Sequence, residues 1–179
     1  MAGENLDRDY LDRPLRELFD NVAGTDSVPA AGSVIAALGA LAAGLAAKVA
    51  HRSAAQLSDS EEIARQADEL RKRLEPLITA DAVGYAAALA TRGDRVAAMQ
   101  SLSSELVLMI ETAAKITELA SPLAVNGNPN LRYDAAAAVR IAVTVAEIGA
   151  DLVEANLGDS DLSRRAHAAV AMAHAAAKS

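Results

Sequence analysis

Residues 28–50 read VPAAGSVIAALGALAAGLAAKVA, and this stretch decides the fold. It opens with Pro29 and a turn of small residues, and it carries no charge before Lys48. A helix built from such short side chains lets neighbouring backbones approach closely, which suits the centre of a bundle better than its surface. The turn before it leaves helix N–H groups that can bind an anionic or polar ligand. The stretch therefore predicts a central bundle helix, and the turn before it is either a ligand-binding site or only the start of that helix.

The composition fits one all-α domain over residues 1–179. Hydrophobic residues make up 52% of the chain and aromatic residues only 2%, so Ala, Leu and Val must fill the core. No run alternates with a period of two, which argues against a sheet. Apolar residues at helical spacing instead predict an antiparallel bundle of about six helices around the Ala-rich central one. The expected helices span residues 6–22, about 31–57, 60–89 with a kink or split at Pro76, 94–121, 133–157 and 162–177.

Charge and residue usage exclude several classes of partner. A net charge of −7 and an isoelectric point near 4.9 argue against a nucleic-acid surface. The chain contains no Cys, so it has no disulfide or thiolate metal site, and a cytoplasmic location is expected. The three histidines, His51, His167 and His174, lack acidic neighbours at ligand spacing, so no metal site is predicted. Residues 27–47 are long enough to span a membrane, but Ala and Gly contribute little transfer energy, which favours a buried bundle helix.

Three segments, in this order, resemble motifs of one enzyme family. PAAGSVIAALGALAAGLAAKVA (residues 29–50) is similar to a P-G-G-G-S-V-A-A loop followed by an Ala-rich helix. DAVGY (81–85) is similar to an Asp-x-x-Ala-aromatic pattern, and GNPNLRYDAAAAV (127–139) to Gly-Asn followed by Ser-Asp and a small-residue helix. Asn156 and Leu157 stand where the same family has Asn-Leu. Together they resemble the cyclodeaminase/cyclohydrolase part of the formiminotransferase-cyclodeaminase family.

This resemblance implies a helical, homodimeric enzyme that acts on a one-carbon adduct of tetrahydrofolate, with no covalently bound cofactor. In such enzymes 5-formimino-tetrahydrofolate closes to the 5,10-methenyl form with loss of ammonia, or the methenyl form is hydrolysed to the 10-formyl form. The resemblance makes Asp81 and Asp134 the catalytic carboxylates. The ligand-binding positions that it implies are Ala31, Gly32, Ser33, Tyr85, Asn128, Tyr133 and Asn156. A second copy of the chain is also expected because an Ala-rich helix without large side chains needs another surface to cover it.

The sequence departs from the family pattern at positions that would face the ligand. Ala30 and Ala31 replace two of three loop glycines, Tyr133 replaces a small Ser, and Leu152 replaces the first Asn of a pair. The family's basic-aromatic segment after the central helix is missing, which leaves Lys48 and Arg52 as substitutes. Because the helical framework survives, two alternatives follow. The chain is a diverged homologue that uses the same cavity for a cyclisation or elimination on another small molecule, or it is a non-catalytic helical subunit.

Each candidate residue also has an ordinary structural role open to it. Asp81, Asp134 and Ser33 are all good helix N-caps, and Asn128 beside a glycine is typical of a turn. Tyr85 lies within an apolar stripe, where a tyrosine most often packs into the core with its hydroxyl at the edge. The spacing of these residues does not decide between the two readings.

Overall fold

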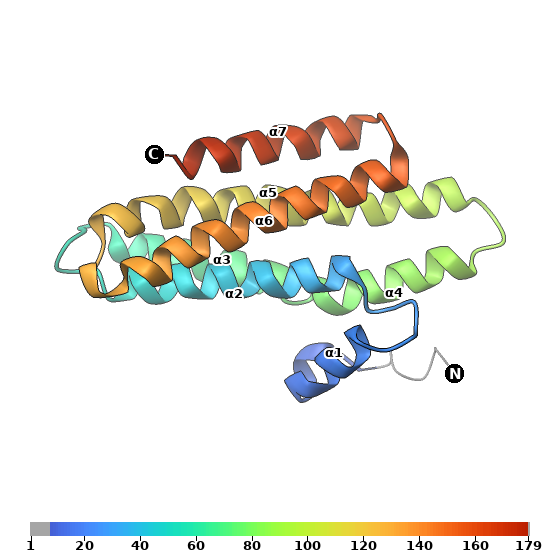
Figure 1. Cartoon of the computed structure of the whole chain (residues 1–179), viewed down its shortest axis with the longest axis horizontal. Coiled ribbons are helices and arrows are strands. Elements are labelled where there is room, and N and C mark those ends of the chain that lie inside the picture. The colour runs from blue at the N-terminus through green and yellow to red at the C-terminus, as the bar shows by residue number, and fades with distance from the viewer. Residues whose placement is uncertain (1–7, 179) are drawn as a thin grey trace.

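Helices make up all the regular structure in residues 8–178, the part of the chain that the computed structural model describes (Figure 1). No strand occurs in that range, so the all-α prediction is confirmed. The elements are η1 (Tyr10–Asp12), α1 (Leu15–Val22), α2 (Ala31–His51), α3 (Ser60–Leu74), α4 (Leu77–Ala90), α5 (Arg95–Asn126), η2 (Pro129–Leu131), α6 (Arg132–Leu157) and α7 (Asp161–Ala176). Leu6, where the first helix was expected to begin, lies outside the described residues.

The long helices run side by side, and α2 lies among them as predicted (Figure 1). It packs on α3, α4, α5 and α6, while α7 covers α5 and α6 on the opposite side of the bundle. α2 and α6 are antiparallel, because Lys48 pairs with Asp134 near one end and Gly39 lies against Val145 further along. An 18-residue window of α2 reaches a mean hydropathy of 1.8 and is 61% buried within the fold. The apolar run is therefore the central helix of the bundle.

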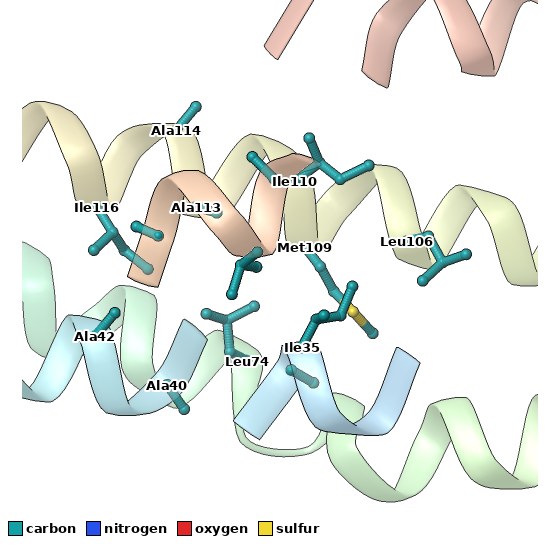
Figure 2. Close-up of a cluster of buried hydrophobic side chains, with 14 of the residues drawn as sticks. Ile35, Ala40, Ala42, Leu74, Leu106, Met109, Ile110, Ala113, Ala114 and Ile116 are labelled. Atoms are coloured by element: carbon teal, nitrogen blue, oxygen red, sulfur yellow. The ribbon is translucent and has the colours of Figure 1, made fainter. Parts of the chain in front are cut away.

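Small residues on α2 and α6 let the larger side chains of their neighbours fill the core. Ala36, Ala42, Ala43 and Ala46 of α2 are fully buried. Figure 2 shows Ile35 of this helix beside Met109 of α5, with Ala40 and Ala42 further along the same helix. A Cβ added to Gly149 of α6 would lie 2.6 Å from Cγ1 of Ile110, and one added to Gly39 would lie 2.8 Å from Cδ1 of Leu74. Close packing of backbones, rather than of aromatic rings, builds this core.

Helix boundaries differ from the predicted ones where tertiary contacts intervene. α2 ends at His51 rather than near Leu57, because the buried Ser53 hydroxyl donates to the Val49 carbonyl and accepts from the Asn128 N–H. Pro76 splits the expected helix of residues 60–89 into α3 and α4, which raises the expected helix count by one. Asp59 occupies the N-cap position of α3 without a side-chain hydrogen bond to the first turn. Asp94 caps α5 at the start of the helix expected from residue 94, accepting from the Ala97 N–H at 3.0 Å.

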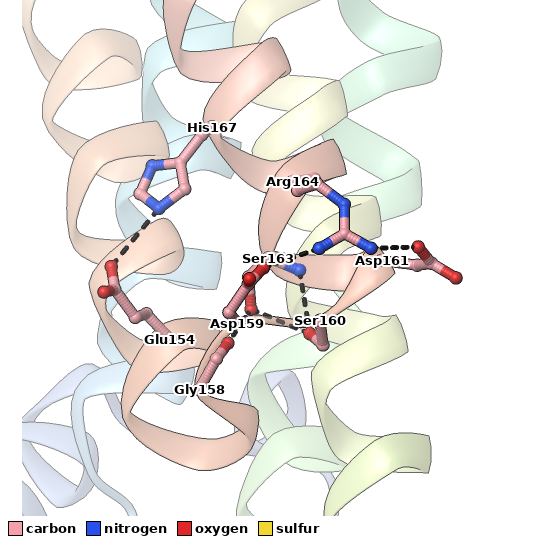
Figure 3. A network of polar contacts seen from close by, with 8 residues as sticks. All are labelled: Glu154, Gly158, Asp159, Ser160, Asp161, Ser163, Arg164 and His167. Carbon is pink, nitrogen blue, oxygen red and sulfur yellow. Dashed lines mark hydrogen bonds and ion pairs between the residues drawn. The ribbon is translucent and has the colours of Figure 1, made fainter.

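The connection from α6 to α7 is held by a local polar network, drawn in Figure 3. Gly158 ends α6 with a φ of 59°, a left-handed value that favours glycine. Ser160 caps α7 by accepting from the Ser163 N–H, and the Ser163 hydroxyl donates to the Gly158 carbonyl at 2.6 Å. His167 of α7 pairs with Glu154 of α6 at 3.2 Å, and these contacts fix α7 on the bundle.

The segment before α2 attaches to the bundle mainly through one point. Tyr10 is buried, and its N–H donates to the Thr79 hydroxyl of α4, which itself donates to Asp9. α1 begins just after Pro14, and none of its eight residues is buried. Its apolar residues at helical spacing, together with Leu11 of η1, remain exposed: Leu11, Leu15, Phe19 and Val22. In Figure 1, α1 lies outside the bundle, next to α2 and α4.

Candidate active site at the first turn of the central helix

The carboxylate of Asp81 lies against the first turn of α2. Asp81 stands on α4 and is only 5% exposed, and its Oδ2 accepts a hydrogen bond from the Ser33 hydroxyl at 2.9 Å. A Cβ added to Gly32 would lie 2.0 Å from Oδ1 of the same carboxylate. Position 32 therefore accepts only glycine while Asp81 keeps this place.

The local sequence explains why a carboxylate settles there. Ala30 occupies the N-cap of α2 and has no side chain that can accept from the N–H groups of the first turn. Asp81 accepts from both the hydroxyl and the backbone N–H of Ser33, so a residue of another helix supplies the missing acceptor. The helix dipole also favours a negative group at this end. The Ser33 donors of the turn are thus directed at Asp81, and neither Ser33 nor Asp81 caps its own helix.

Burial raises the pKa of the Asp81 carboxyl above its ordinary value, because the charged form loses its hydration. The side-chain and backbone hydrogen bonds from Ser33 act in the opposite direction, and the negative charge of Glu105 raises the pKa further. Since burial has the largest influence, the net direction is upward. Such a carboxyl exchanges a proton nearer to neutral pH than an exposed aspartate, which suits acid-base chemistry.

Glu105 is the second acidic residue of the site, and it was not among the residues predicted from the sequence. It is half-buried on α5, and its Oε2 has no hydrogen-bond partner among the described residues. Glu105 lines a cavity of about 210 Å³ between α4 and α5, together with Gly84, Ala87, Ala88, Thr91, Ala98, Ser101 and Leu102. One signal was available: Glu105 is the single acidic residue in residues 95–110, and it is flanked by apolar positions of the helix.

Three further predicted residues lie toward the same end of the bundle. Ala31 is the exposed first residue of α2. Tyr85 follows Asp81 by one turn of α4 and is half-buried against the main core. Asn156 of α6 donates from Nδ2 to the buried Ser103 hydroxyl of α5 at 3.3 Å. Within residues 8–178, none of these three side chains forms a hydrogen bond with the Asp81 carboxylate.

The remaining predicted residues lie at the other end of α2. Asp134, in the first turn of α6, pairs with Lys48 at 2.8 Å across the surface. Asn128 has structural partners: its Oδ1 accepts from the Asn130 N–H, and its Nδ2 donates to the Arg52 carbonyl at 2.9 Å. Tyr133 is 74% exposed. The Arg132 guanidinium stacks over its ring.

The two predicted carboxylates do not meet within one chain. Asp81 marks the end of α2 at Ser33, and Asp134 marks the end at Lys48. Fifteen residues separate Ser33 from Lys48. At 1.5 Å per residue this spacing is about 22 Å along the helix axis. A single chain therefore offers one buried carboxylate site and one exposed ion pair.

The alanines that replace two loop glycines fit without backbone strain. Ala30 is extended, with φ −129° and ψ −157°, and Ala31 is helical. No residue other than glycine has a positive φ in the part of the chain that the structure describes. The retained glycine, Gly32, is the one on which the Asp81 carboxylate rests. Leu152 of α6, another departure from the family pattern, is half-buried and packs against the main core.

Histidines on α7 form pairs rather than a cluster. His167 contacts Glu154, and His174 contacts Glu147 at 2.9 Å, one helical repeat further along α6. Within residues 8–178, no group of three or more His, Cys, Asp or Glu side chains is placed to hold a metal ion.

Comparisons with known proteins identify the fold and the family. Over 94% of this chain and 91% of the other, the structure is similar to the crystal structure of formiminotetrahydrofolate cyclodeaminase from Thermotoga maritima, with a TM-score of 0.81 and 22% identity. A search of curated proteins gives no significant match. The formiminotransferase-cyclodeaminase family model matches residues 14–176, nearly the whole chain. The chain therefore belongs to the formiminotransferase-cyclodeaminase family.

Proposed function

We propose that this protein is a cyclodeaminase/cyclohydrolase-type enzyme that acts on a one-carbon adduct of tetrahydrofolate, either the 5-formimino or the 5,10-methenyl form. Family membership supports the reaction class. The observation that carries the proposal is the buried Asp81 carboxylate, held by Ser33 on Gly32 with its pKa raised. A buried carboxyl beside a second acidic residue, Glu105, is an arrangement expected of acid-base catalysis.

Asp81 has two tasks available to it in this chemistry. In cyclodeamination, N10 attacks the formimino carbon, the bond from that carbon to the departing nitrogen breaks, and a proton donor must convert this nitrogen to ammonia. The raised pKa of Asp81 favours its protonated form, which donates that proton. In hydrolysis of the methenyl form, ionised Asp81 accepts a proton from the attacking water. Its charge also stabilises the delocalised cation of the methenyl group.

The direct test follows the near-ultraviolet absorbance of methenyl-tetrahydrofolate with and without protein. Turnover above the buffer rate is expected. Asp81→Asn should lower kcat by about 100-fold or more, because a positioned acid-base group contributes about that much. Glu105→Gln should lower kcat less, because Glu105 acts partly by raising the pKa of Asp81 through its negative charge.

Glu111→Gln is the matched control for Glu105→Gln. Glu111 lies on the same helix but pairs with Arg165 of α7, so its loss should leave the rate unchanged. Absence of turnover by the wild-type protein, together with no folate-dependent rise in melting temperature, would contradict the folate proposal. Unchanged rates in Asp81→Asn would place the chemistry elsewhere.

One observation favours a diverged homologue that acts on another, smaller molecule. The cavity that Glu105 lines measures about 210 Å³. Pockets for drug-sized ligands usually measure about 300–1,000 Å³. A cyclisation or elimination on a small substrate would fit this cavity, where Glu105 is the acidic side chain. Melting-temperature shifts given by small pterins but not by complete folates would support this alternative, and shifts given only by complete folates would exclude it.

A further inference from the structure

α7 is shorter than the helices that it covers, so part of their surface has no helix packed over it. α7 runs antiparallel to α6, because His167 pairs with Glu154 and His174 pairs with Glu147. α6 has 26 residues and α7 has 16, so ten residues of α6, about 15 Å of helix, extend beyond the end of α7. Figure 1 shows α5 and α6 continuing past that end.

A cavity of about 680 Å³ lies where α7 ends. Its walls come from α5, α6 and the residue after α7, and most of them are short apolar side chains: Ala124, Val125, Ala136, Val139, Val143 and Ala177. Alanine and valine are too small to fill the space that α7 leaves open. The volume falls within the range of about 300–1,000 Å³ that is usual for small-molecule sites.

The cavity lies on a different side of the bundle from the Asp81 site. Ala135 and Ala138 of α6 are buried in a cluster with residues of α2. Ala136 and Arg140, which are one helical turn apart, line the cavity instead. α6 therefore separates the cavity from α2, and Asp81 at the first turn of α2 takes no part in it.

Two cations line this cavity without a partner. Arg140 and Lys178 are both exposed, and neither side chain has a hydrogen bond or ion pair among residues 8–178. The Thr144 hydroxyl, also on the lining, has no partner within that range either. The buried Ser121 hydroxyl donates to the Thr117 carbonyl, so it offers the cavity only an acceptor.

No acidic side chain among the described residues lines the cavity to neutralise these cations. The acids that flank it along α5 and α6 are each paired with another cation: Glu118 with Lys115, Asp134 with Lys48, and Glu147 with His174. The whole chain has 24 acidic residues against 17 Lys and Arg. Unpaired cations around an acid-free cavity are therefore not what composition would produce by itself, and they favour an anionic ligand.

A second hollow of similar size shows the contrast. It measures about 690 Å³, lies between α2 and the N-terminal segment, and has engaged cations. Arg71 pairs there with Asp68 and Glu75, and the Arg13 guanidinium lies over the Tyr10 ring. Glu75 also lines that hollow and would repel an anion. An anionic ligand therefore gains more at the end of α7.

We propose that the cavity at the end of α7 binds a small organic acid, a molecule with one anionic group on an apolar body. The Arg140 guanidinium and the Lys178 ammonium bind the anionic group at the open edge, and the Thr144 hydroxyl donates a further hydrogen bond. The alanine and valine walls contact the apolar body. This second site goes beyond the proposed function, because it uses none of the residues assigned to the reaction.

The test uses 8-anilinonaphthalene-1-sulfonate, a fluorescent probe with a sulfonate on an apolar ring system, in titrations of the full chain. Arg140→Gln and Lys178→Gln should each weaken its binding by about fivefold, which corresponds to about 1 kcal/mol for a partly solvated charge contact. The double variant should weaken it by at least about tenfold. Both side chains are exposed, so the helical circular dichroism should stay unchanged.

Two matched controls separate charge from shape. Arg73→Gln removes another exposed arginine without a partner in the described range, on α3 and outside the cavity, so it should leave the affinity unchanged. N-phenyl-1-naphthylamine has the same rings without the sulfonate, and it should bind the wild type and the double variant equally. Added salt should weaken binding of the sulfonate but not of the neutral probe.

A substitution that fills the cavity gives a second, independent measurement. Ala136 is half-buried in the wall, so Ala136→Phe should remove the binding of both probes to this cavity. Probe bound in the hollow beside α2 forms a background that none of these variants changes.

Equal sulfonate affinity of the wild type and the double variant would overturn the proposal. Loss of the neutral probe in the double variant would overturn it too, because the two cations would then act through shape. A charge-dependent signal that survives Ala136→Phe would place the anion elsewhere. No folate enters these titrations, so their result is independent of the folate assay.

Discussion

The two ends of α2 each bury a serine completely, but the serines have different partners. The Ser53 hydroxyl donates to the Val49 carbonyl and accepts from the Asn128 N–H, so backbone groups satisfy it. The Ser33 hydroxyl donates to the Asp81 carboxylate. Both arrangements meet the requirement that buried polar groups be hydrogen-bonded. Only the Ser33 hydroxyl donates its hydrogen bond to a group that can change its charge, the Asp81 carboxyl.

Polar groups at one end of α2 therefore hold the fold together, whereas those at the other end include a group suited to chemistry. At the Ser53 end, the predicted ligand residue Asn128 is bound to backbone, and Asp134 forms an exposed ion pair. At the Ser33 end, two carboxylates lie in a region without a recorded ion pair to a cation among the described residues. Uncompensated buried acid costs stability, and proteins accept that cost mainly at functional sites.

The largest expected effect is at the Ser33 end. Gly32→Ala should lower the free energy of unfolding by about 3 kcal/mol, because the added Cβ collides with a carboxylate that cannot move away freely. Chemical denaturation of wild type and variant measures this difference. Gly84→Ala on α4 is the control, because its added Cβ would lie 3.4 Å from Cδ1 of Leu102, an ordinary contact. Alanine also stabilises a helix by about 1 kcal/mol relative to glycine, so this variant should lose no stability. Equal stability of Gly32→Ala and wild type would show that Asp81 is not fixed on the turn.

The next largest effect is at the Ser53 end. Ser53→Ala should cost about 1–3 kcal/mol, because it leaves the N–H of the half-buried Asn128 without its acceptor. Urea denaturation measures the loss. The substitution should leave catalysis unaffected, since this end of a single chain holds the serine for structural reasons. A drop in kcat without a drop in stability would remove the distinction between the two ends.

A third effect depends on pH and belongs to Asp81 alone. Its pKa is higher in the folded protein than in the unfolded chain, so its contribution to stability is complete below the unfolded pKa and is lost as pH rises through the folded pKa. Asp81→Asn removes this loss. Relative to wild type, the variant should therefore gain stability as pH rises from the ordinary aspartate pKa of 3.8 through the folded pKa, by about 1.4 kcal/mol for each unit of the shift. Denaturation at several pH values measures the gain, and a constant difference across that range would contradict it.

The smallest effect concerns the exposed pair at the Ser53 end. A double-mutant cycle of Lys48→Ala and Asp134→Ala should give a coupling energy of about 0.2–1 kcal/mol, because both side chains are largely solvated. The coupling should fall further at high salt. A coupling several times larger, insensitive to salt, would show that this pair is buried in the protein as it exists in solution.

The sequence predicts much of this fold because its decisive signals are local. The Ala-rich stretch, the cap at Asp94 and the break at Pro76 each act within a few residues of the chain. The end of α2 was misplaced because Ser53 binds Asn128, a residue 75 positions away, and no local pattern reveals such a contact.

The candidate site was predicted in part. Gly32, Ser33 and Asp81 were named from family motifs, and the structure brings these three together. Glu105 was missed because one acid among apolar residues is usually the solvated edge of a helix. The separation of Asp81 from Asp134 was not predicted. The order of motifs along a chain does not show that one of them packs against the first turn of α2 and the other against its last turns.

The alanine-rich interior of α2 has a consequence for how this sequence can vary over time. Alanine is already the smallest side chain that a helix tolerates well, so nearly every change at the fully buried positions, such as Ala42 or Ala46, adds volume to a filled space. Substitutions in α2 should therefore accumulate at its exposed and half-buried positions. Two homologues that share this core would differ first at those positions, which are the ones that can contact other molecules.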